Sequence, residues 1–445
     1  MQKILTIACV LLTFKGFSQS SDTCWSLRKC IDTALAKSIS IKQNVVQVAN
    51  AGIELNQAQM NRYPSLSFST PLGVQLGRSI NPITNTFTPN SLLYQTFSAS
   101  GSLPLINWGK LVDQAKSQRA AFEATVLMEA KEKGDIELSV MQNYLQTFLS
   151  KEQLNNAIIQ LRQTKKQLEV ANIRFKSDKL TEIDLAQLTS QLATDSISVL
   201  TQRNAFDKNL IALKALINIP FSVPFDVNTS DLSPKAPNAV PSNPEQVYFE
   251  ALQNLPLAKG DQLKIQSAEL NLAAAKKSLY PSLSLDYNLS SSFSNYFFHQ
   301  SFAQLWSGYG FQAKGNFTQQ ISLTFTVPIF SNNRLQNAVK QSRLDIESSN
   351  YQLDQDCLQL KQTIYSLYSD VVFADKVYEE GKSALSGSET AYNLTLKGFE
   401  FGAKDVFTLL TSQNNLAKVQ QAQTANRCDL IFKSLMLQFY SDGKL

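Results

Sequence analysis

The sequence has little of the chemistry that enzymes and metal sites need. It contains a single histidine, His299, which has no second histidine with which to share a metal ion. Its five cysteines are too few for a disulfide scaffold, and Cys9 lies near the N-terminus. Gly381-Lys382-Ser383 looks like the end of a phosphate loop, but Lys376 stands where that loop needs a glycine. We therefore expect no enzyme, metal site or other cofactor.

Long apolar runs are also missing, except at the start. Lys3, the apolar stretch 4–14 and the small residues near Ser18 have the order of a secretory signal, which we expect to occupy residues 1–18. This stretch is shorter than the roughly 20 apolar residues of a membrane helix, and no later stretch is long enough. The sequence thus predicts an exported chain without a membrane helix. In an oxidising compartment, Cys24 and Cys30 either form a disulfide or are simply small residues around the first helix.

Charge of one sign is not concentrated anywhere. The formal charge of +5 falls to +3 when Lys3 and Lys15 leave with the signal, and no basic cluster remains. This balance gives no support to nucleic-acid binding.

Proline is absent between Pro104 and Pro220 and again after Pro328. Such stretches favour long helices. We expect helical hairpins over about 107–218 and 332–440, each made of two antiparallel helices of about 50 residues and about 75 Å long. If each hairpin turns near its midpoint, the tips fall at 149–152 and 373–376.

The chain contains an internal duplication. Tyr63-Pro64-Ser65-Leu66 recurs letter for letter as Tyr280-Pro281-Ser282-Leu283, and the prolines that leave the following strands, Pro104 and Pro328, also correspond. The second copy has seven extra residues between its two prolines. We assign repeat 1 to residues 19–220, a proline-rich linker to 221–244, and repeat 2 to 245–445.

Four stretches alternate apolar and polar residues, which is the pattern of strands with one apolar face. They cover about 64–77, 93–105, 281–291 and 316–330. A helical segment precedes each pair, with breaks near residues 38–40 and 254–256. These faces fit a membrane β-barrel, lipid outside and water inside, or a half-buried sheet in a soluble sandwich. In lipid, four strands would leave two bare edges, so other copies of the chain would have to close the barrel.

The order helix, strand, strand, long helical hairpin, present twice, resembles the TolC-type outer-membrane efflux proteins. The segments 174–181 and 398–405 look like the helix-break motif of that family, which has an aromatic residue followed three positions later by glycine. Phe175, Phe399 and Gly402 fit this motif, whereas Asp178 replaces the first glycine, so we expect a less sharp first turn.

This resemblance implies a mixed α+β membrane fold: a homotrimer with one 12-stranded β-barrel in the outer membrane, continued by an α-helical barrel in the periplasm. It implies an exit duct for efflux or type I secretion that works with a periplasmic adaptor and an inner-membrane pump. It also implies a periplasmic gate, for which Asp370 and Asp375 are the candidates. The alternatives are a periplasmic adaptor, or a structural or adhesive envelope protein. Many aromatic residues gather in 293–311, which we expect at the external rim.

Overall fold

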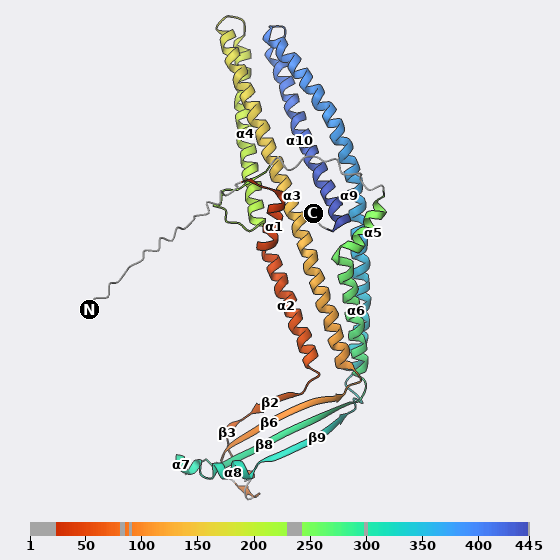
Figure 1. The fold of residues 1–445 in the computed structure, drawn as a ribbon. Helices are drawn as coiled ribbons and strands as arrows, with labels where there is room; N and C mark the ends of the chain where they lie inside the picture. The colour runs from red at the N-terminus through yellow and green to blue at the C-terminus, as the bar shows by residue number, and fades with distance from the viewer. Residues whose placement is uncertain (1–23, 81–84, 89–90, 229–242, 298–300, 444–445) are drawn as a thin grey trace, which may run out of the picture. The chain divides into compact units, whose positions relative to one another are not determined.

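The computed structural model describes residues 24–80, 85–88, 91–228, 243–297 and 301–443 (Figure 1). The expected signal at 1–18 and His299 lie outside these residues. The chain divides into two compact units, and each unit takes segments from both halves of the sequence. The first unit draws on 1–39, 133–250 and 364–445, and the second on 40–132 and 251–363. The sequence repeats are therefore not the compact units.

The first unit is mainly a bundle of long helices. Its core contains fully buried side chains from several helices, including Tyr144, Phe148, Leu213 and Leu409. Two short strands, β1 (Cys24–Trp25) and β7 (Asp226–Val227), pair in parallel in this unit. Its helices are α1 (Leu27–Lys37), α4 (Glu182–Leu216), most of α5 (Pro244–Asn254), α10 (Val406–Asp442), and the C-terminal parts of α3 (Lys110–Phe175) and α9 (Arg334–Glu400).

The second unit joins a sheet to the N-terminal parts of α3 and α9, together with α2 (Ile39–Met60) and α6 (Pro256–Lys277). Helices α3 and α6 are joined by polar contacts at two levels. The Ser117 and Ser267 hydroxyls lie 2.9 Å apart, and the Lys277 ammonium donates to the Asp113 carboxylate at 2.5 Å. A Cβ at Gly260 would meet the terminal methyl group of Met128 and would require that flexible side chain to move.

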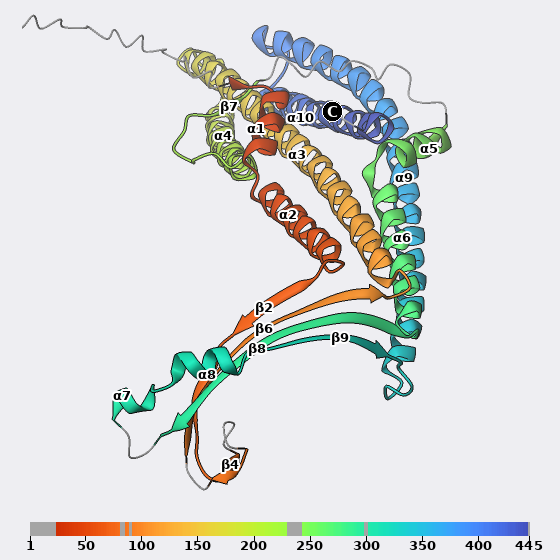
Figure 2. The same ribbon diagram turned by 60° about the horizontal axis from the view of Figure 1, so that its bottom comes forward.

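The sheet is antiparallel, in the order β2-β6-β8-β9 (Figure 2). Strand β3 pairs with β6 beyond the end of β2. The register runs without interruption between Ser98 and Leu103 of β6, which pair with Ser290 and Leu285 of β8. The edges are β2 and β3 on one side and β9 on the other. The strands are β2 (Ser65–Ser69), β3 (Leu72–Gln75), β6 (Leu92–Ile106), β8 (Ser282–Tyr296) and β9 (Thr318–Thr326), and a small hairpin joins β4 (Ser79–Ile80) to β5 (Phe87–Thr88).

The strand expected at 64–77 is two strands, because Pro71 has no N–H to donate to the ladder. The Pro71 carbonyl still accepts from the Thr96 backbone N–H at 3.0 Å, so β6 stays beside the chain across the break. The expected helix breaks near residues 38–40 and 254–256 are confirmed, since α1 gives way to α2 at Ser38 and α5 gives way to α6 at Leu255.

The expected linker 221–244 is not wholly a connector. Its described N-terminal part includes β7, in which Val227 is fully buried. Phe225, which directly precedes β7, is 7% exposed. Phe225 packs edge-on against Trp25 with ring centroids 5.2 Å apart. The apolar side chains between the prolines attach this stretch to the first unit, which the proline count alone did not indicate.

The midpoint prediction for the hairpin tips is wrong. Helix α3 has 66 residues and α4 has 35, so the first turn lies at 176–181 rather than 149–152. Helix α9 has 67 residues and α10 has 37, which places the second turn at 401–405 rather than 373–376. The helices are unequal because the start of α3 packs against α2 and α6, where Gly52 faces Phe122 and Ser117 bonds Ser267.

Candidate functional site

The sheet has one polar face. Asp286 of β8 is the only charged residue in the described strands β2, β3, β6, β8 and β9. Its carboxylate accepts hydrogen bonds from three hydroxyls, Ser102 at 2.7 Å, Thr324 at 2.6 Å and Ser284 at 3.0 Å. These donors come from β6, β9 and β8, so one carboxylate links three adjacent strands.

The opposite face of the sheet is apolar and exposed. The register places Leu66 opposite Gly101, Gly101 opposite Tyr287 and Tyr287 opposite Ile321, so one row of this face crosses β2, β6, β8 and β9. Large apolar side chains on this face are mostly open: Leu66 is 79%, Phe68 66%, Ile321 71%, Leu323 64% and Phe325 67% exposed. A contiguous apolar surface of this kind marks a protein or membrane contact.

The two hairpin turns have the same backbone geometry. Asp178 and Gly402, which are 224 positions apart, both adopt the left-handed conformation, with φ of 55° and 78°. After each, a backbone N–H reaches back five residues, from Lys179 to Arg174 at 3.0 Å and from Ala403 to Gly398 at 2.7 Å. This is the Schellman ending of a helix. The expectation of a less sharp first turn is therefore wrong, because aspartate tolerates the left-handed region better than most residues.

The helices that leave these turns begin in the same way. Thr181 caps α4, and its hydroxyl and the Asp184 carboxylate form a reciprocal capping box. Asp405, 224 positions later, caps α10 by accepting from the Thr408 N–H at 2.8 Å. A hydrogen bond from the Thr408 side chain, and after it the one from the Thr408 backbone N–H, lowers the pKa of the Asp405 carboxyl below its usual value.

One arginine connects the two turns. Arg174, at the end of α3, donates to the Phe399 carbonyl at 2.7 Å and to the Glu400 carbonyl at 2.5 Å. These carbonyls belong to the last turn of α9, where a cation also complements the helix dipole. The Phe399 ring is buried among apolar side chains, whereas its sequence equivalent Phe175 is 37% exposed.

A polar cluster lies inside the helical bundle behind the turns. Thr164 of α3 donates to the Asp195 carboxylate of α4 at 2.6 Å and accepts from the Gln413 amide of α10 at 2.9 Å. Asp195 is only 5% exposed, and Gln191 donates to its second oxygen at 2.9 Å. Three helices are thereby held in register. Sequence reasoning missed this cluster, although the many Gln and Thr residues of these helices were a signal for it.

Asp370 and Asp375 do not lie at a hairpin tip. Both are exposed and sit inside α9, and Asp375 precedes Glu400 by 25 residues, or about 38 Å of helix. The expectation that placed these carboxylates at the tip of the second hairpin is wrong, because the hairpin turns later than its midpoint. Their assignment to a periplasmic gate stays a prediction.

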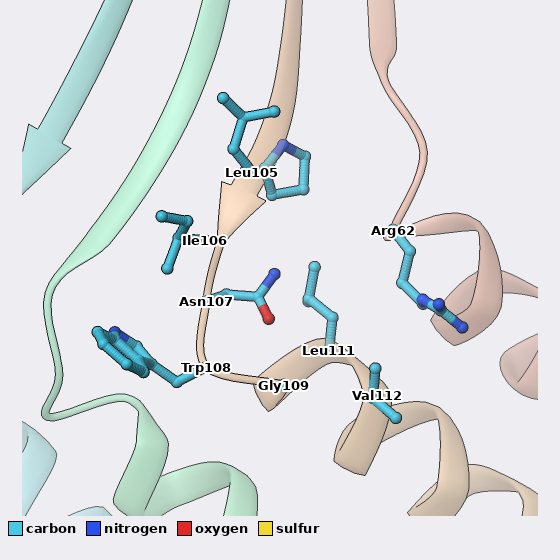
Figure 3. A pocket seen from close by; sticks show the side chains of 9 residues that line it. Arg62, Leu105, Ile106, Asn107, Trp108, Gly109, Leu111 and Val112 are labelled. Atoms are coloured by element: carbon cyan, nitrogen blue, oxygen red, sulfur yellow. The ribbon is translucent and has the colours of Figure 1, made fainter.

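The repeat landmarks lie where strands meet helices. After each strand pair, two consecutive residues take positive φ: Trp108 and Gly109 in the first repeat, and Asn332 and Asn333 in the second. The Trp108 indole N–H donates to the Pro281 carbonyl at 2.6 Å. The first junction borders a shallow pocket of about 370 Å³, shown in Figure 3. Its lining comprises Arg62 and residues 104–109, 111 and 112.

The landmark prolines bound the strands in part. Tyr63 and Pro64 directly precede β2, and Tyr280 and Pro281 directly precede β8. Pro104 lies inside β6, next to an irregularity in its pairing with β8, while Pro328 follows the end of β9.

A second pocket of about 480 Å³ lies in the same unit, between α2, α3 and α6.

Aromatic side chains cluster at the end of β8. Phe293 is fully buried, stacks on Trp306 with centroids 5.6 Å apart, and meets the Tyr309 ring edge-on at 4.9 Å. Trp306 and Tyr309 belong to the connection that carries two short helices, α7 (Phe302–Leu305) and α8 (Tyr309–Gly315). Of the aromatic residues predicted as a group at 293–311, the structure thus brings Phe293, Trp306 and Tyr309 together, whereas Phe311 is 84% exposed. Phe298 lies outside the described residues.

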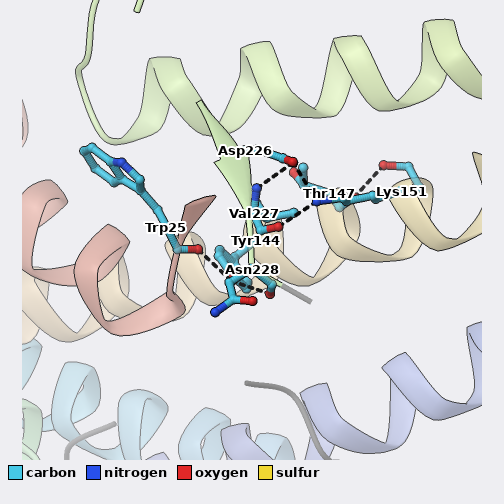
Figure 4. A network of polar contacts seen from close by, with 8 residues as sticks. Trp25, Tyr144, Thr147, Lys151, Asp226, Val227 and Asn228 are labelled. Carbon is cyan, nitrogen blue, oxygen red and sulfur yellow. Dashed lines mark hydrogen bonds and ion pairs between the residues drawn. The ribbon is translucent and has the colours of Figure 1, made fainter. Parts of the chain in front are cut away.

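Tyr144 fixes the N-terminal strand to the bundle (Figure 4). Its hydroxyl lies 2.9 Å from the Trp25 carbonyl and 3.0 Å from the Asn228 carbonyl. Close by, the Lys151 ammonium donates to the Asp226 carboxylate at 2.7 Å and to the Val227 carbonyl at 2.9 Å. Two side chains of α3, Tyr144 and Lys151, therefore hold the strand pair β1 and β7 against that helix.

The described cysteines, Cys24, Cys30, Cys357 and Cys428, are all free thiols, so Cys24 and Cys30 form no disulfide. Burial raises the pKa of Cys30 and of Cys428 to about 12. Within the described ranges, no cluster of acidic, His and Cys side chains is arranged to hold a metal ion. In the same residues, no helix combines the length and apolarity needed to span a membrane.

Comparison with known proteins identifies a family and several relatives that match parts of this chain. The family model described as "Outer membrane efflux protein" matches residues 30–218 and 247–438. The pyoverdine export outer membrane protein OpmQ of Pseudomonas putida is 24% identical over 73% of this chain. The outer membrane efflux protein BepC of Brucella suis is 22% identical over 61% of this chain. The matches span 65% of OpmQ and 55% of BepC, which is less than two thirds of each relative.

A solved structure shares the fold at low sequence identity. The outer-membrane channel OprN superposes with a TM-score of 0.76 at 14% identity, over 94% of this chain and 90% of OprN. At this identity, the likeness establishes a common fold.

Proposed function

Because the chain belongs to the outer membrane efflux protein family, we propose that it is the outer-membrane exit duct of an efflux or type I secretion system. It passes small molecules or polypeptides to the exterior. The family consists of ducts rather than enzymes. The side chains of the described residues fit a duct, because they form a polar surface along the strands. Within the described residues, no catalytic groups come together.

One observation carries this proposal: the sheet has an exposed apolar face, a polar face and two unpaired edges. In a membrane, the apolar face turns to lipid and the polar face to water. The open backbone groups of β2 and β9 cannot remain unpaired in hydrocarbon. A homotrimer satisfies them, since three copies of four strand positions close into one 12-stranded barrel in the outer membrane.

The long hairpins then continue the duct into the periplasm. Helix α9, with 67 residues, is about 100 Å long, far longer than a globular domain requires. A periplasmic adaptor and an inner-membrane pump are the partners that we infer for such a duct, because outer-membrane efflux proteins work with both in tripartite systems. The export role in the names of OpmQ and BepC agrees with this assignment.

The test compares two variants with the same charge change on opposite faces of β9. The double variant Ile321→Lys, Leu323→Lys places two ammonium groups on the apolar face, at a cost of about 2–4 kcal/mol each near the bilayer centre. The control, Gln320→Lys with Ser322→Lys, places them on the polar face. We expect only the control to form detergent-stable trimers and ion-conducting channels in planar bilayers.

Two results would count against the proposal. Equal conductance in both variants would mean that the two faces do not separate lipid from water. A stable, water-soluble monomer of the unmodified chain without detergent would contradict the barrel itself.

A further inference from the structure

Helix α8 lies against the strands by one side only. The side chains of Tyr309, Gln312 and Asn316 contact β6 or β8, and the Ala313 carbonyl accepts from Ser291 of β8 at 2.6 Å. These positions have the spacing i, i+3, i+4, i+7 of one helix face. Phe311 and Lys314 occupy the opposite face, and both are exposed.

The register shows which face of the sheet α7 and α8 cover. Phe293 and Ser291 are odd-numbered residues of β8, like Leu289 and Tyr287, and β8 pairs with β6 without a shift between these positions. They therefore project to the apolar face. Phe293 packs on Trp306 and Tyr309, Ser291 bonds α8, and the Asn295 amide donates to the Leu305 carbonyl of α7 at 3.0 Å.

Contacts of β6, which pairs with β8, also place α8 on the apolar face. Gln95 and Phe97 of β6 lie opposite Phe293 and Ser291. The Tyr309 hydroxyl donates to Gln95 at 2.9 Å, and its ring meets the Phe97 ring edge-on at 6.4 Å. Five strand side chains thus assign α7 and α8 to the apolar face, at the end of the strands away from α6 (Figure 2).

The length of the uncovered apolar face fits a bilayer. Between the start of β8 and its contact with α8, residues 283–290 remain uncovered, which is about 26 Å of strand at 3.3 Å per residue. With the tilt of about 40° usual for barrels, this corresponds to about 20 Å along the membrane normal, close to the apolar band of about 25 Å. Helices α7 and α8 therefore begin where the hydrocarbon ends.

The outer surface of these helices has the chemistry of a membrane interface. Phe302 is 80% exposed and Phe311 is 84% exposed, in contrast to the fully buried Phe293 and the half-buried Trp306 and Tyr309. Lys314 stands on the same outward side of α8 as Phe311. Aromatic rings beside a lysine are typical of segments that lie at the level of lipid headgroups.

From this geometry, and resting on the proposed barrel, we propose that residues 301–316 form an interfacial anchor that lies on the lipid side of the sheet. Phe302 and Phe311 enter the headgroup layer of the outer leaflet, and Lys314 meets its phosphates. The anchor sets the depth of the sheet in the membrane. It does not cap the pore, because it lies on the face opposite Asp286.

The test measures the depth of single fluorescent labels on the full-length trimer in lipid bilayers. Cysteines replace Phe311, Ile321 or Gln320, one at a time, in a chain whose native cysteines are alanines. Lipids carry a nitroxide quencher at the headgroup or at the middle of the acyl chain, and iodide reports on water. The two control positions are adjacent in β9, with Ile321 on the apolar face and Gln320 on the polar face.

We expect the label at 321 to be quenched by the acyl-chain nitroxide, and the label at 320 by iodide alone. The label at 311 should be quenched more strongly by the headgroup nitroxide than by either other quencher. Quenching at 311 by iodide alone, with 321 still in lipid, would overturn the anchor and leave the duct intact. Loss of acyl-chain quenching at 321 in a conducting trimer would overturn the lipid-facing sheet and the anchor together.

Discussion

The Arg174 guanidinium lies over the ring of Phe399, 4.9 Å from its centroid, and donates to the Phe399 carbonyl at 2.7 Å. These two residues belong to different helical hairpins, so a single side chain joins the ends of α3 and α9. The Phe399 carbonyl also accepts from the Gly402 backbone N–H at 3.0 Å, so Arg174 adds a charged donor to the carbonyls at the C-terminal end of α9.

Arg174→Ala should loosen the second turn. Loss of two charge-assisted hydrogen bonds by a half-buried side chain costs about 1–2 kcal/mol, which corresponds to roughly 5–30-fold more frequent local opening. Amide hydrogen exchange over residues 398–404 measures this directly. Arg162→Ala, which removes an exposed arginine from the same helix, is the control and should leave exchange unchanged. Equal exchange in the two variants would show that Arg174 does not hold the turn.

Gly402→Ala should strain the second turn, whereas Asp178→Gly should relax the first. A Cβ in the left-handed region costs about 1–2 kcal/mol, and Gly402 has φ of 78°. Trypsin cleavage after Lys404 should therefore accelerate in Gly402→Ala, by roughly 5–30-fold if opening limits cleavage. Cleavage after Lys179 in Asp178→Gly should stay the same or slow. The reverse order of effects would refute the shared geometry of the turns.

Tyr144→Phe should release the N-terminal strand. The hydroxyl lies within hydrogen-bond distance of the Trp25 and Asn228 carbonyls. The Trp25 carbonyl also accepts from the Asn228 backbone N–H at 3.0 Å, so loss of the hydroxyl costs about 0.5–1.5 kcal/mol. Limited proteolysis at Arg28 and Lys29 should accelerate, while cleavage at the distant turn after Lys404 should not. Unchanged cleavage at Arg28 would mean that β1 is held by other contacts.

Cys30 and Cys428 should resist thiol reagents at pH 8. Burial raises the pKa of both thiols to about 12, so their thiolate fraction at pH 8 is roughly a thousandfold below that of an ordinary thiol with a pKa near 9. Exposed Cys24 provides the internal comparison, followed by mass spectrometry of the modified peptides. Labelling of Cys428 as fast as that of Cys24 in the folded protein would contradict this burial.

The same pKa shifts predict the direction of a pH effect on stability. In the unfolded chain these thiols ionise near pH 9, while the folded chain keeps them protonated. The unfolded state therefore loses protons first, and stability falls as the pH rises from about 9 towards 12. Alanine at both positions should reduce this alkaline loss in thermal melts, and an unchanged alkaline slope would show that other groups cause it.

Asp286→Asn should weaken the cation preference of the proposed channel. In the proposed trimer, threefold symmetry would bring three copies of this carboxylate to the polar side of the barrel, where a negative ring favours cations. The reversal potential in a salt gradient measures the preference. Ser102→Ala, which removes one hydrogen bond but no charge, should retain it. A reversal potential that is unchanged in a conducting Asp286→Asn trimer would exclude this residue from selectivity.

Local patterns determined much of this fold. Alternation of apolar and polar residues predicted the four strand positions, since side chains of a strand project to opposite faces. The absence of proline predicted the long helices. The duplication was also readable, and the structure shows it in the backbone itself, because positions 224 residues apart share left-handed conformations at Asp178 and Gly402 and at Trp108 and Asn332.

Only the tertiary structure decided where the hairpins turn and which residues the turns bring together. Helix α3 has no glycine or proline at its end. Asp178 there adopts the left-handed conformation that is most common for glycine. The length of each helix depends on the elements that pack against it. Helix α3 is longer than α4 because α2 and α6 cover its first turns. Packing between distant segments also decides two other features. It brings Arg174 to Phe399, 225 residues later in the sequence, and it places α8 on the apolar face of the sheet. No local sequence pattern encodes either contact.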